Sequence, residues 1–509
     1  MAKKKSLVKN SIFNMAYKGF TALFPLVTTT YISRIILPEG VGRVSYANTI
    51  VAYFVLVASL GLPSYGVKAI AQNNETKEQR SRTFFELFLI NFVATAFCTV
   101  AYFLLVNNFP HFAGRRTLFN IMGLMLILNV FNIDWFYQGM EEYAYIATRG
   151  FVVKILSFVL MLILVRDAGD YLWYALILCV ATAGNNLLNA ANLRKYVSLR
   201  AAFGKAAGKE RMADSGTKAG ERCVSGMGQH LRPVMVLLAS ALATEVYTML
   251  DTIMLEYYHG EICVGYYANP VKIVRMVYTV VIALVAVFYP RISMYYKQQN
   301  QEGCNALLEQ GTQILLLLAL PCTIGLALTA DVLIPFLFGE AFLPSINTLR
   351  VLSVLVLVFS IAYFLGHTVL TAVGGEHFIL RATVAGAVIN AVANFMLIPE
   401  LKQDGAAIAS VVSEVVVTGI LLWYARKYYA IAIGRRYAGS LAAALLAMTG
   451  TVFVMRSVLK ENDWTVLVVI AAAAAVYAAV LVVCRNPLAI ELIEKVGNRR
   501  SAISGRNKG

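Results

Sequence analysis

The chain has 509 residues, of which 59% are hydrophobic and 14% are charged, and its formal net charge is +16. Apolar stretches of about 20 residues recur along the whole length, and each is long enough for a helix to cross a hydrocarbon core of about 30 Å. This composition excludes a soluble globular protein. The stretches are continuous rather than alternating, which favours helices over a β-barrel, so the sequence predicts an all-α integral membrane protein.

About fourteen transmembrane helices are expected from these stretches. The first apolar run is too long for a cleavable signal core, so we expect the first helix to be retained. In chain order, the predicted helices cover residues 11–36, 42–62, 84–106, 116–138, 144–166, 171–192, 231–256, 262–290, 307–330, 346–373, 378–399, 404–425, 437–458 and 464–484.

Lys and Arg cluster in alternate loops between these helices. Basic clusters lie at residues 3–9, 194–232 and 499–508, whereas the intervening loops carry acidic residues such as Asp167 and Asp170. This alternation is the positive-inside pattern, which puts both termini in the cytoplasm. The positive charge is therefore explained by membrane topology, and no nucleic-acid partner is expected.

The longest polar stretch separates six predicted helices from eight, and the two sides share short motifs. Tyr46-Ala47-Asn48 recurs as Tyr267-Ala268-Asn269, and Gly139-Met140-Glu141 has a counterpart in Gly374-Gly375-Glu376, at equivalent points of the helix count. We therefore predict two pseudo-symmetric six-helix lobes in parallel orientation, with a substrate site between them near the membrane midplane. The predicted domains are an N-lobe at 1–192, a cytoplasmic linker at 193–230, a C-lobe at 231–430, two added helices at 431–486 and a cytoplasmic tail at 487–509.

Charged side chains inside the predicted helices are candidates for function, because each costs about 2.5–3.5 kcal/mol on insertion scales. Near the helix ends, the alternative is a side chain that snorkels to the interface. For the deeper cations, the alternatives are a structural ion pair and a hydrated cavity that receives an anion. The anion-binding candidates are Lys18, Arg34, Lys154, Lys272 and Arg275, and the ion-coupling candidates are Asp134, Glu245, Asp251 and Glu414.

Two predicted helices carry asparagines spaced to share one helix face. Asn185 and Asn189 are four residues apart in the sixth helix, and Asn390 and Asn394 repeat that spacing in the eleventh. These amides either form interhelical hydrogen bonds or line a sugar-binding wall, and the sequence leaves both readings open.

Motifs of enzymes and metal sites are absent from the sequence. It contains no P-loop, no HExxH and no GxSxG, and its seven cysteines are scattered singly without a CxxC pair. Of five dispersed histidines, His367 alone lies inside a predicted helix, where a packing role is favoured over a proton relay. We expect no enzymatic activity, no cofactor and no metal site.

Short motifs in a fixed order connect the chain to a known family. They are Lys9-Asn10-Ser11-Ile12-Phe13-Asn14, Ser33-Arg34-Ile35-Ile36-Leu37-Pro38, Gly40-Val41-Gly42 before Tyr46-Ala47-Asn48, Gly61-Leu62-Pro63 with Tyr65-Gly66 and Lys68, and Asp134-Trp135-Phe136 with Gln138-Gly139 and Glu141. In these motifs the chain resembles the oligosaccharide flippases of the polysaccharide-transport family, often called Wzx-type. That family shares a superfamily with the multidrug and toxic compound extrusion (MATE) transporters and the lipid II flippases.

The resemblance implies a MATE-like two-lobe bundle that works by alternating access in the bacterial cytoplasmic membrane. The implied substrate is an oligosaccharide repeat unit on undecaprenyl pyrophosphate, flipped for O-antigen, capsule or exopolysaccharide assembly. The expected partners are this lipid-linked oligosaccharide, membrane lipid, and a polysaccharide polymerase with other assembly proteins. The energy source is left open between the membrane potential acting on the pyrophosphate and proton or sodium antiport.

Three other functions are alternatives to this one. A multidrug cation exporter would favour unpaired carboxylates in the cavity, whereas the deep charges here lean towards Lys and Arg. A lipid II flippase would use the same mechanism with a different sugar. An integral-membrane glycosyltransferase or polymerase would need acidic residues in long outer loops, and the predicted outer loops are short.

Overall fold

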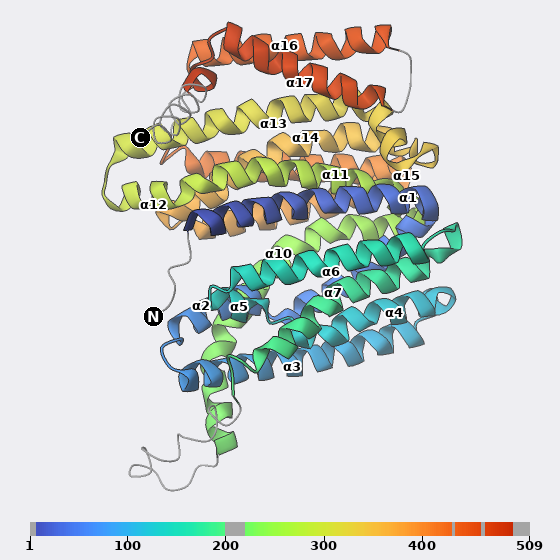
Figure 1. The fold of residues 1–509 in the computed structure, drawn as a ribbon, viewed down its shortest axis with the longest axis vertical. Coiled ribbons are helices and arrows are strands. Elements are labelled where there is room, and N and C mark those ends of the chain that lie inside the picture. The colour runs from blue at the N-terminus through green and yellow to red at the C-terminus, as the bar shows by residue number, and fades with distance from the viewer. Residues whose placement is uncertain (1–6, 199–218, 430–432, 460–463, 492–509) are drawn as a thin grey trace, which may run out of the picture. The chain divides into compact units, whose positions relative to one another are not determined.

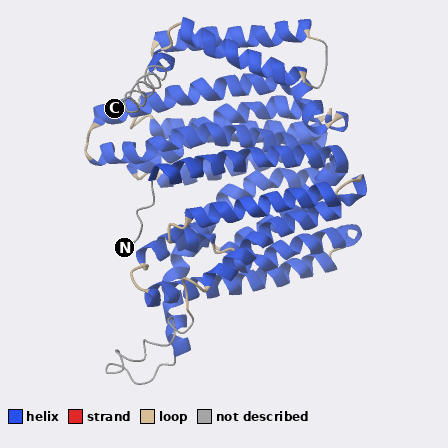
Figure 2. Cartoon of the chain, viewed as in Figure 1, coloured by secondary structure: helices blue, strands red, loops and turns tan. Residues whose placement is uncertain are grey.

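The structure is a computed structural model that describes residues 7–198, 219–429, 433–459 and 464–491. Within these residues the regular structure is helical throughout, which confirms the predicted all-α class (Figure 1, Figure 2). The chain divides into two compact units, Met1–Gly265 and Tyr266–Gly509. Each unit is described separately below.

The first unit contains the helices up to the start of α11. Short 3-10 segments connect some of them. Helix α10 begins at Ala219, inside the linker predicted at 193–230, and so starts earlier than the helix predicted at 231–256. The elements are α1 (Leu7–Ser59), α2 (Leu62–Gln72), α3 (Lys77–Asn108), η1 (Pro110–Arg115), α4 (Arg116–Ile127), η2 (Leu128–Phe131), α5 (Asp134–Gly139), α6 (Tyr143–Leu164), η3 (Ala168–Asp170), α7 (Tyr171–Leu193) and α10 (Ala219–His259).

The second unit begins within α11, and its described residues include a segment of π-helix, η6. Its elements are α11 (Glu261–Val285), η4 (Ala286–Phe288), α12 (Tyr289–Lys297), α13 (Gln301–Phe338), η5 (Glu340–Phe342), α14 (Ser345–Tyr363), η6 (Phe364–Leu370), η7 (Thr371–Val373), α15 (Glu376–Ala425), α16 (Arg435–Val458) and α17 (Thr465–Val483).

Eleven helical stretches among the described residues are long and apolar enough to span a membrane. Two of them each cover two predicted helices, because the loops predicted at 37–41 and 400–403 are reduced to one non-helical residue each, Leu37 and Lys402. The break at Leu37 has a local cause, since a following proline disfavours helical backbone at that position, and Pro38 comes next. The multi-pass membrane architecture is thereby confirmed, although at these two places a single non-helical residue stands where a loop was predicted.

The predicted helix at 116–138 is wrong as a single element. The α-helix ends at Ile127, a 3-10 turn follows, and α5 restarts at Asp134. Asparagine side chains stabilise this break: the Asn132 amide donates to Asn129 Oδ1 at 3.3 Å, and the Asn129 amide donates to Ser59 Oγ at 3.3 Å. Short polar side chains bind locally in this way in competition with the helix. The predicted helix at 262–290 likewise ends early, at Val285.

Aromatic packing dominates the core of the first unit. Phe84 of α3 stacks on Trp135 of α5 at a centroid distance of 5.8 Å and meets Phe136 edge-on at 5.2 Å. The same cluster includes Val234 of α10, which is fully buried. Segments from both sides of the predicted linker therefore share one core.

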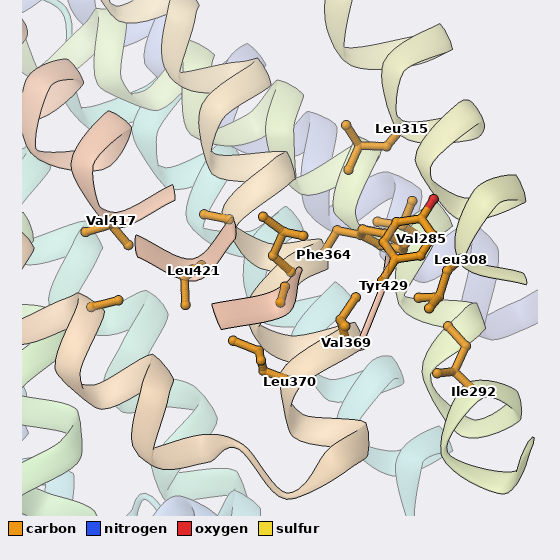
Figure 3. Packing of buried hydrophobic residues seen from close by; sticks show 14 of the residues in the cluster. Val285, Ile292, Leu308, Leu315, Phe364, Val369, Leu370, Val417, Leu421 and Tyr429 are labelled. Atoms are coloured by element: carbon orange, nitrogen blue, oxygen red, sulfur yellow. The ribbon is translucent and has the colours of Figure 1, made fainter. Parts of the chain in front are cut away.

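In the second unit, apolar side chains from α11 to α15 form a core cluster that includes Leu315, Phe364 and Leu421 (Figure 3). Helices α16 and α17 pack on α13 through a separate apolar cluster. Two tyrosines add hydrogen bonds there: Tyr437 donates to the Gln313 carbonyl at 2.6 Å, and Tyr477 donates to the Leu317 carbonyl at 2.7 Å.

Candidate functional site

The structure brings three of the predicted site residues together around one arginine. The Arg149 guanidinium donates from Nη2 to Asp134 Oδ1 at 2.8 Å and from Nε to Asn185 Oδ1 at 3.0 Å. The Asn189 amide donates to the same Asp134 oxygen at 2.7 Å. We call Asp134, Arg149, Asn185 and Asn189 the Asp134 network. It joins α5, α6 and α7 of the first unit.

The Asp134 network is buried on one side and open on the other. The Arg149 side chain is 4% exposed, whereas the Asp134 side chain is 36% exposed. Two buried polar atoms of the network, Arg149 Nη1 and Asn189 Oδ1, have no hydrogen-bond partner among the described residues. Because unpaired buried polar atoms are costly, this geometry suits a site that takes up a water molecule or a polar ligand group.

Close backbone packing holds α5, which carries Asp134, against α2. A Cβ atom at Gly66 would lie 2.4 Å from the Trp135 ring, and one at Gly139 would lie 2.8 Å from Ile70. Hydrogen bonds then fix the neighbouring helix, since Tyr137 donates to the Asn189 carbonyl at 2.7 Å. The position of Asp134 is thus set by packing on both sides.

The cations predicted to bind an anion are distributed over helices α1, α6 and α11. Lys154 is half-buried on α6, and its Nζ lies 5.8 Å from the centroid of the Phe24 ring on α1. Arg34 is exposed on α1. In the second unit, α11 carries Lys272, which is half-buried, and Arg275, which is exposed. The side chain of Lys18 lies outside the described residues.

The amides predicted in the second lobe are buried. Asn390 is 1% exposed and Asn394 is fully buried, and the Asn394 amide donates to Asn390 Oδ1 at 3.0 Å. This geometry favours the packing interpretation over a sugar-binding wall for that pair. Glu414, on the same helix α15, is also buried.

Of the remaining acidic candidates, Asp251 is buried and Glu245 is half-buried, both on α10 in the first unit.

An ionic network in the first unit was missed by the sequence reasoning. The Arg115 guanidinium lies 2.6 Å from Glu256 Oε1 and 3.0 Å from Glu261 Oε1, and Arg43 donates to Glu261 Oε2 at 2.7 Å. His111 lies 3.2 Å from the other Glu256 oxygen. We call these five residues the Glu256 network. They lie near helix ends in the sequence, where charge alone carries no signal of pairing between helices.

Glycines allow the backbones beside the Glu256 network to touch. A Cβ at Gly42 would lie 1.7 Å from the Glu261 carbonyl oxygen, and one at Gly265 would lie 2.0 Å from the Pro38 carbonyl oxygen. Any larger residue at either position would force α1 and the start of α11 apart. The ionic network therefore lies beside a direct backbone contact.

A further cluster, around the buried residues Glu86 and His230, joins α2, α3 and α10. The Tyr65 hydroxyl lies 2.7 Å from His230 Nδ1, and His230 Nε2 lies 3.1 Å from Glu86 Oε2. Arg82 donates to the other Glu86 oxygen at 3.0 Å. This cluster and Val234 hold α10 against the helices that precede the linker.

Two known families match parts of this chain. The family described as "Polysaccharide biosynthesis protein" matches residues 7–296, more than half of the chain. The chain belongs to this family. The polysaccharide biosynthesis family match includes the whole Asp134 network and the Glu256 network. A second family, "Lipid II flippase MurJ", matches residues 228–474.

Two relatives of this family member are informative. A candidate O-antigen transporter of Escherichia coli (strain K12) is 20% identical over 425 residues, covering 83% of this chain and 98% of the relative. A glycan biosynthesis flippase assigned in Haloferax volcanii, Agl15, is 21% identical over 226 residues, covering 44% of this chain and 48% of the relative.

Solved structures give the fold. The lipid II flippase MurJ in an inward closed conformation matches with a TM-score of 0.74 at 11% identity, covering 95% of this chain and 99% of that one. An inward-facing MATE transporter matches with a TM-score of 0.61 at 16% identity, covering 80% and 93%. The polysaccharide biosynthesis family member therefore has the MATE-like fold expected from its sequence.

Proposed function

We propose that this protein is a flippase that moves oligosaccharide repeat units linked to undecaprenyl pyrophosphate across the bacterial cytoplasmic membrane by alternating access. The product would supply surface polysaccharide assembly. The observation that carries the proposal is membership of the polysaccharide biosynthesis family over residues 7–296. The O-antigen transporter relative, which aligns over 98% of its own length, supports the same substrate class.

The chemistry of this substrate explains why a protein is needed. Each sugar hydroxyl costs several kcal/mol in hydrocarbon without a hydrogen-bond partner, and a pyrophosphate adds about two negative charges, whose burial is far more costly. A hydrated cavity that presents cations removes most of this barrier, while the polyprenyl tail stays in lipid. Lys272 and Arg275 on α11 fit the role of the cations in this cavity, because neither is fully buried.

The membrane potential is the energy source we favour. Moving one charge across the membrane is worth about 2.3 kcal/mol per 100 mV, so the outward passage of two negative charges would gain about 4–5 kcal/mol. The rival is proton or sodium antiport through the acidic candidates. The pairing of Asp134 with Arg149 at 2.8 Å supports the membrane potential as the energy source, since the Asp134 carboxylate already has a counter-ion.

The test is the double variant Lys272→Ala with Arg275→Ala. We expect loss of surface polysaccharide in cells that depend on this protein, with the variant still present in the membrane fraction. Surface polysaccharide would be measured by sugar-specific staining and membrane content by immunoblot. The matched control is Arg291→Ala with Lys297→Ala, which removes two exposed cations of α12 in the same unit. Normal export in the first variant would overturn the role of these two cations.

A lipid II flippase is the second candidate function. It is favoured by the match of the MurJ family to residues 228–474 and by the TM-score of 0.74 to a MurJ structure. Depletion experiments separate the two functions. A lipid II flippase is required for peptidoglycan synthesis, so depletion would cause lysis, whereas depletion of a polysaccharide flippase would remove surface glycan from intact cells.

We also propose that both termini lie in the cytoplasm, as the alternation of basic loops predicts. A reporter enzyme that is active only in the cytoplasm should then be active when it is fused to either end. A reporter that is active only outside the cytoplasm should be inactive at both ends.

A further inference from the structure

A cavity of about 230 Å³ lies in the second unit, between α13, α16 and α17 (Figure 1). Its volume is well above the roughly 10–15 Å³ that a single water molecule needs. Polar and apolar side chains from all three helices line it, among them Thr329, Arg456, Ser457, Thr465, Val466 and Val469. None of them belongs to the Asp134 network or the Glu256 network, so the cavity is a separate candidate site.

The position of Arg456 puts this cavity at one edge of the membrane. Helix α16 has 24 residues, or about 36 Å along its axis, which is enough to cross a hydrocarbon core of about 30 Å. Arg456 lies in the last turn of α16, and Thr465 is the first residue of α17. The exposed Trp464 precedes α17, and tryptophan is enriched at membrane–water interfaces. The cavity therefore lies where lipid headgroups meet the apolar core.

The charges beside the cavity do not cancel. Asp331 Oδ2 of α13 lies 2.6 Å from Nη2 of Arg456 and 3.6 Å from Nη2 of Arg350, which belongs to α14. We call these three residues the Asp331 cluster. One carboxylate balances one guanidinium, so the cluster carries one net positive charge. Basic pockets between transmembrane helices bind anionic lipid headgroups, and an anion would complete the charge balance here.

Hydrogen bonds fix the Arg456 guanidinium and leave donors for a ligand. Its Nη1 donates to the Leu328 carbonyl at 3.1 Å and to Asp331 Oδ1 at 3.2 Å, and its Nη2 donates to Asp331 Oδ2 at 2.6 Å. These bonds, among the described residues, use three of the five N–H donors of a guanidinium. The Arg456 side chain is 32% exposed, so a ligand can reach the others. Guanidinium N–H groups form strong, charge-assisted hydrogen bonds with phosphate oxygens.

Apolar side chains beside these cations indicate that the anion is carried by a lipid. Val466 and Val469 line the cavity. Around it, α16 and α17 expose large apolar side chains, such as Val458 at 73% and Val468 at 49%. A free phosphate gains nothing from apolar walls, whereas the chains of a lipid bury apolar surface against them.

We infer that this cavity binds an anionic phospholipid, with the phosphate on Arg456 and the first carbons of the chains on the apolar wall. The phosphate supplies the negative charge that the Asp331 cluster lacks. Bound lipid would stabilise the packing of α16 on α13 and α14, the helices that carry the cluster. With the C-terminus in the cytoplasm, as proposed above, the junction of α16 and α17 faces the outer leaflet. The inference does not depend on which substrate is transported.

Thermal unfolding of the purified full-length protein, freed of lipid in an uncharged detergent, tests the inference. Three probes are added separately: phosphatidylglycerol, phosphatidylcholine with the same chains but no net charge, and glycerol phosphate, which has no chains. A ligand that binds the folded protein raises the unfolding temperature according to its concentration and affinity. We expect phosphatidylglycerol to bind best. Arg456→Gln should weaken its binding about tenfold, as for the loss of a charge-assisted hydrogen bond.

A second variant separates the ligand site from the ion pairs. Ser457→Leu adds bulk to the cavity lining at an exposed position and leaves the Asp331 cluster intact. It should weaken phosphatidylglycerol binding without lowering the unfolding temperature of the lipid-free protein. The matched control is Arg166→Gln, which removes an exposed arginine of the first unit. It should bind all three probes as the unaltered protein does.

Three results would overturn the inference. Equal affinity for phosphatidylglycerol and phosphatidylcholine would contradict the role of the net charge. Equal affinity for glycerol phosphate and phosphatidylglycerol would exclude a lipid as the occupant. Undiminished phosphatidylglycerol binding by Arg456→Gln or by Ser457→Leu would show that the lipid binds elsewhere. Because transport is not measured, each of these results leaves the proposed function unaffected.

Discussion

At the scale of single residues, the Asp134 network shows how a charge inside a membrane span is stabilised. Asp134 was selected from the sequence because it is a charged residue inside a predicted helix, but its partner Arg149 was not selected. The buried member of the pair is the arginine, at 4% exposure against 36% for the carboxylate. Removing one partner of a buried pair is costly because it leaves the other charge uncompensated.

This asymmetry gives an ordered prediction for stability. Asp134→Ala should lower the free energy of unfolding by about 3 kcal/mol, since it leaves the buried guanidinium unpaired. Arg149→Ala should cost less, because water can reach the remaining carboxylate. Chemical denaturation in detergent, followed by tryptophan fluorescence, would measure both.

The double variant Asp134→Ala with Arg149→Ala completes this comparison. Contacting residues show coupling free energies of about 0.5–3 kcal/mol, so the double variant should be less destabilised than the sum of the single ones. Additive effects, or a larger loss for Arg149→Ala than for Asp134→Ala, would contradict the interpretation of the network as a buried ion pair.

At the scale of elements, α13 illustrates how a membrane helix tolerates proline. Pro321 lacks an N–H group, so the carbonyl of Leu317, four residues earlier, loses its helical partner. The Tyr477 hydroxyl of α17 donates to that carbonyl at 2.7 Å. Neighbouring helices commonly satisfy backbone groups freed by proline in this way. The docking of α17 on α13 is therefore linked to a proline in α13.

A pair of substitutions tests this link. Tyr477→Phe should destabilise the protein by about 0.6–2 kcal/mol, the range for a hydrogen bond between membrane helices. In a Pro321→Ala background the same change should cost less, because the alanine would supply the missing N–H to the Leu317 carbonyl. Thermal unfolding of the four proteins would be compared. The control Tyr437→Phe removes a bond to the Gln313 carbonyl, whose helical partner is present, so its cost should be the same with proline or alanine at that position of α13.

At the scale of the whole molecule, the first unit includes helix α10, which begins inside the predicted linker and continues beyond it. Val234 joins its core, His230 contacts Glu86 at 3.1 Å, and Glu256 contacts Arg115 at 2.6 Å. Gly61 also approaches the α10 backbone, since a Cβ there would lie 2.9 Å from the Leu238 nitrogen. These contacts should hold the two parts of the chain together without a covalent connection.

Cleavage of the chain tests this expectation. A protease site is inserted in 199–218, and the N-terminal fragment carries a tag. After cleavage in mild detergent, the C-terminal fragment, which contains α10, should remain bound to the tagged fragment. Affinity purification followed by gel electrophoresis would show both fragments. Glu86→Ala with Glu256→Ala should weaken the association, because it breaks two ionic clusters, whereas Glu302→Ala, an exposed carboxylate of α13, should not. Separation of the unaltered fragments would show that the described contacts are insufficient.

Much of the fold could be predicted from the sequence, because lipid leaves helices as the main solution for apolar stretches of this length. The helix positions, the membrane-protein class and the MATE-like fold followed from that constraint and from short motifs. The break between α4 and α5 could not be predicted. It depends on Asn129 meeting Ser59, which is distant in the chain.

The sequence by itself determined which residues carry charge or amide groups within the membrane. A polar group in an apolar stretch costs free energy on insertion, and this cost is the same however the helices are arranged. Only the tertiary structure decided their partners: Asp134 with Arg149, Asn390 with Asn394, and His367 beside Tyr363. The physical reason is that helical periodicity fixes which side chains share a face of one helix, but not which helix that face meets. Pairing across helices is set by packing.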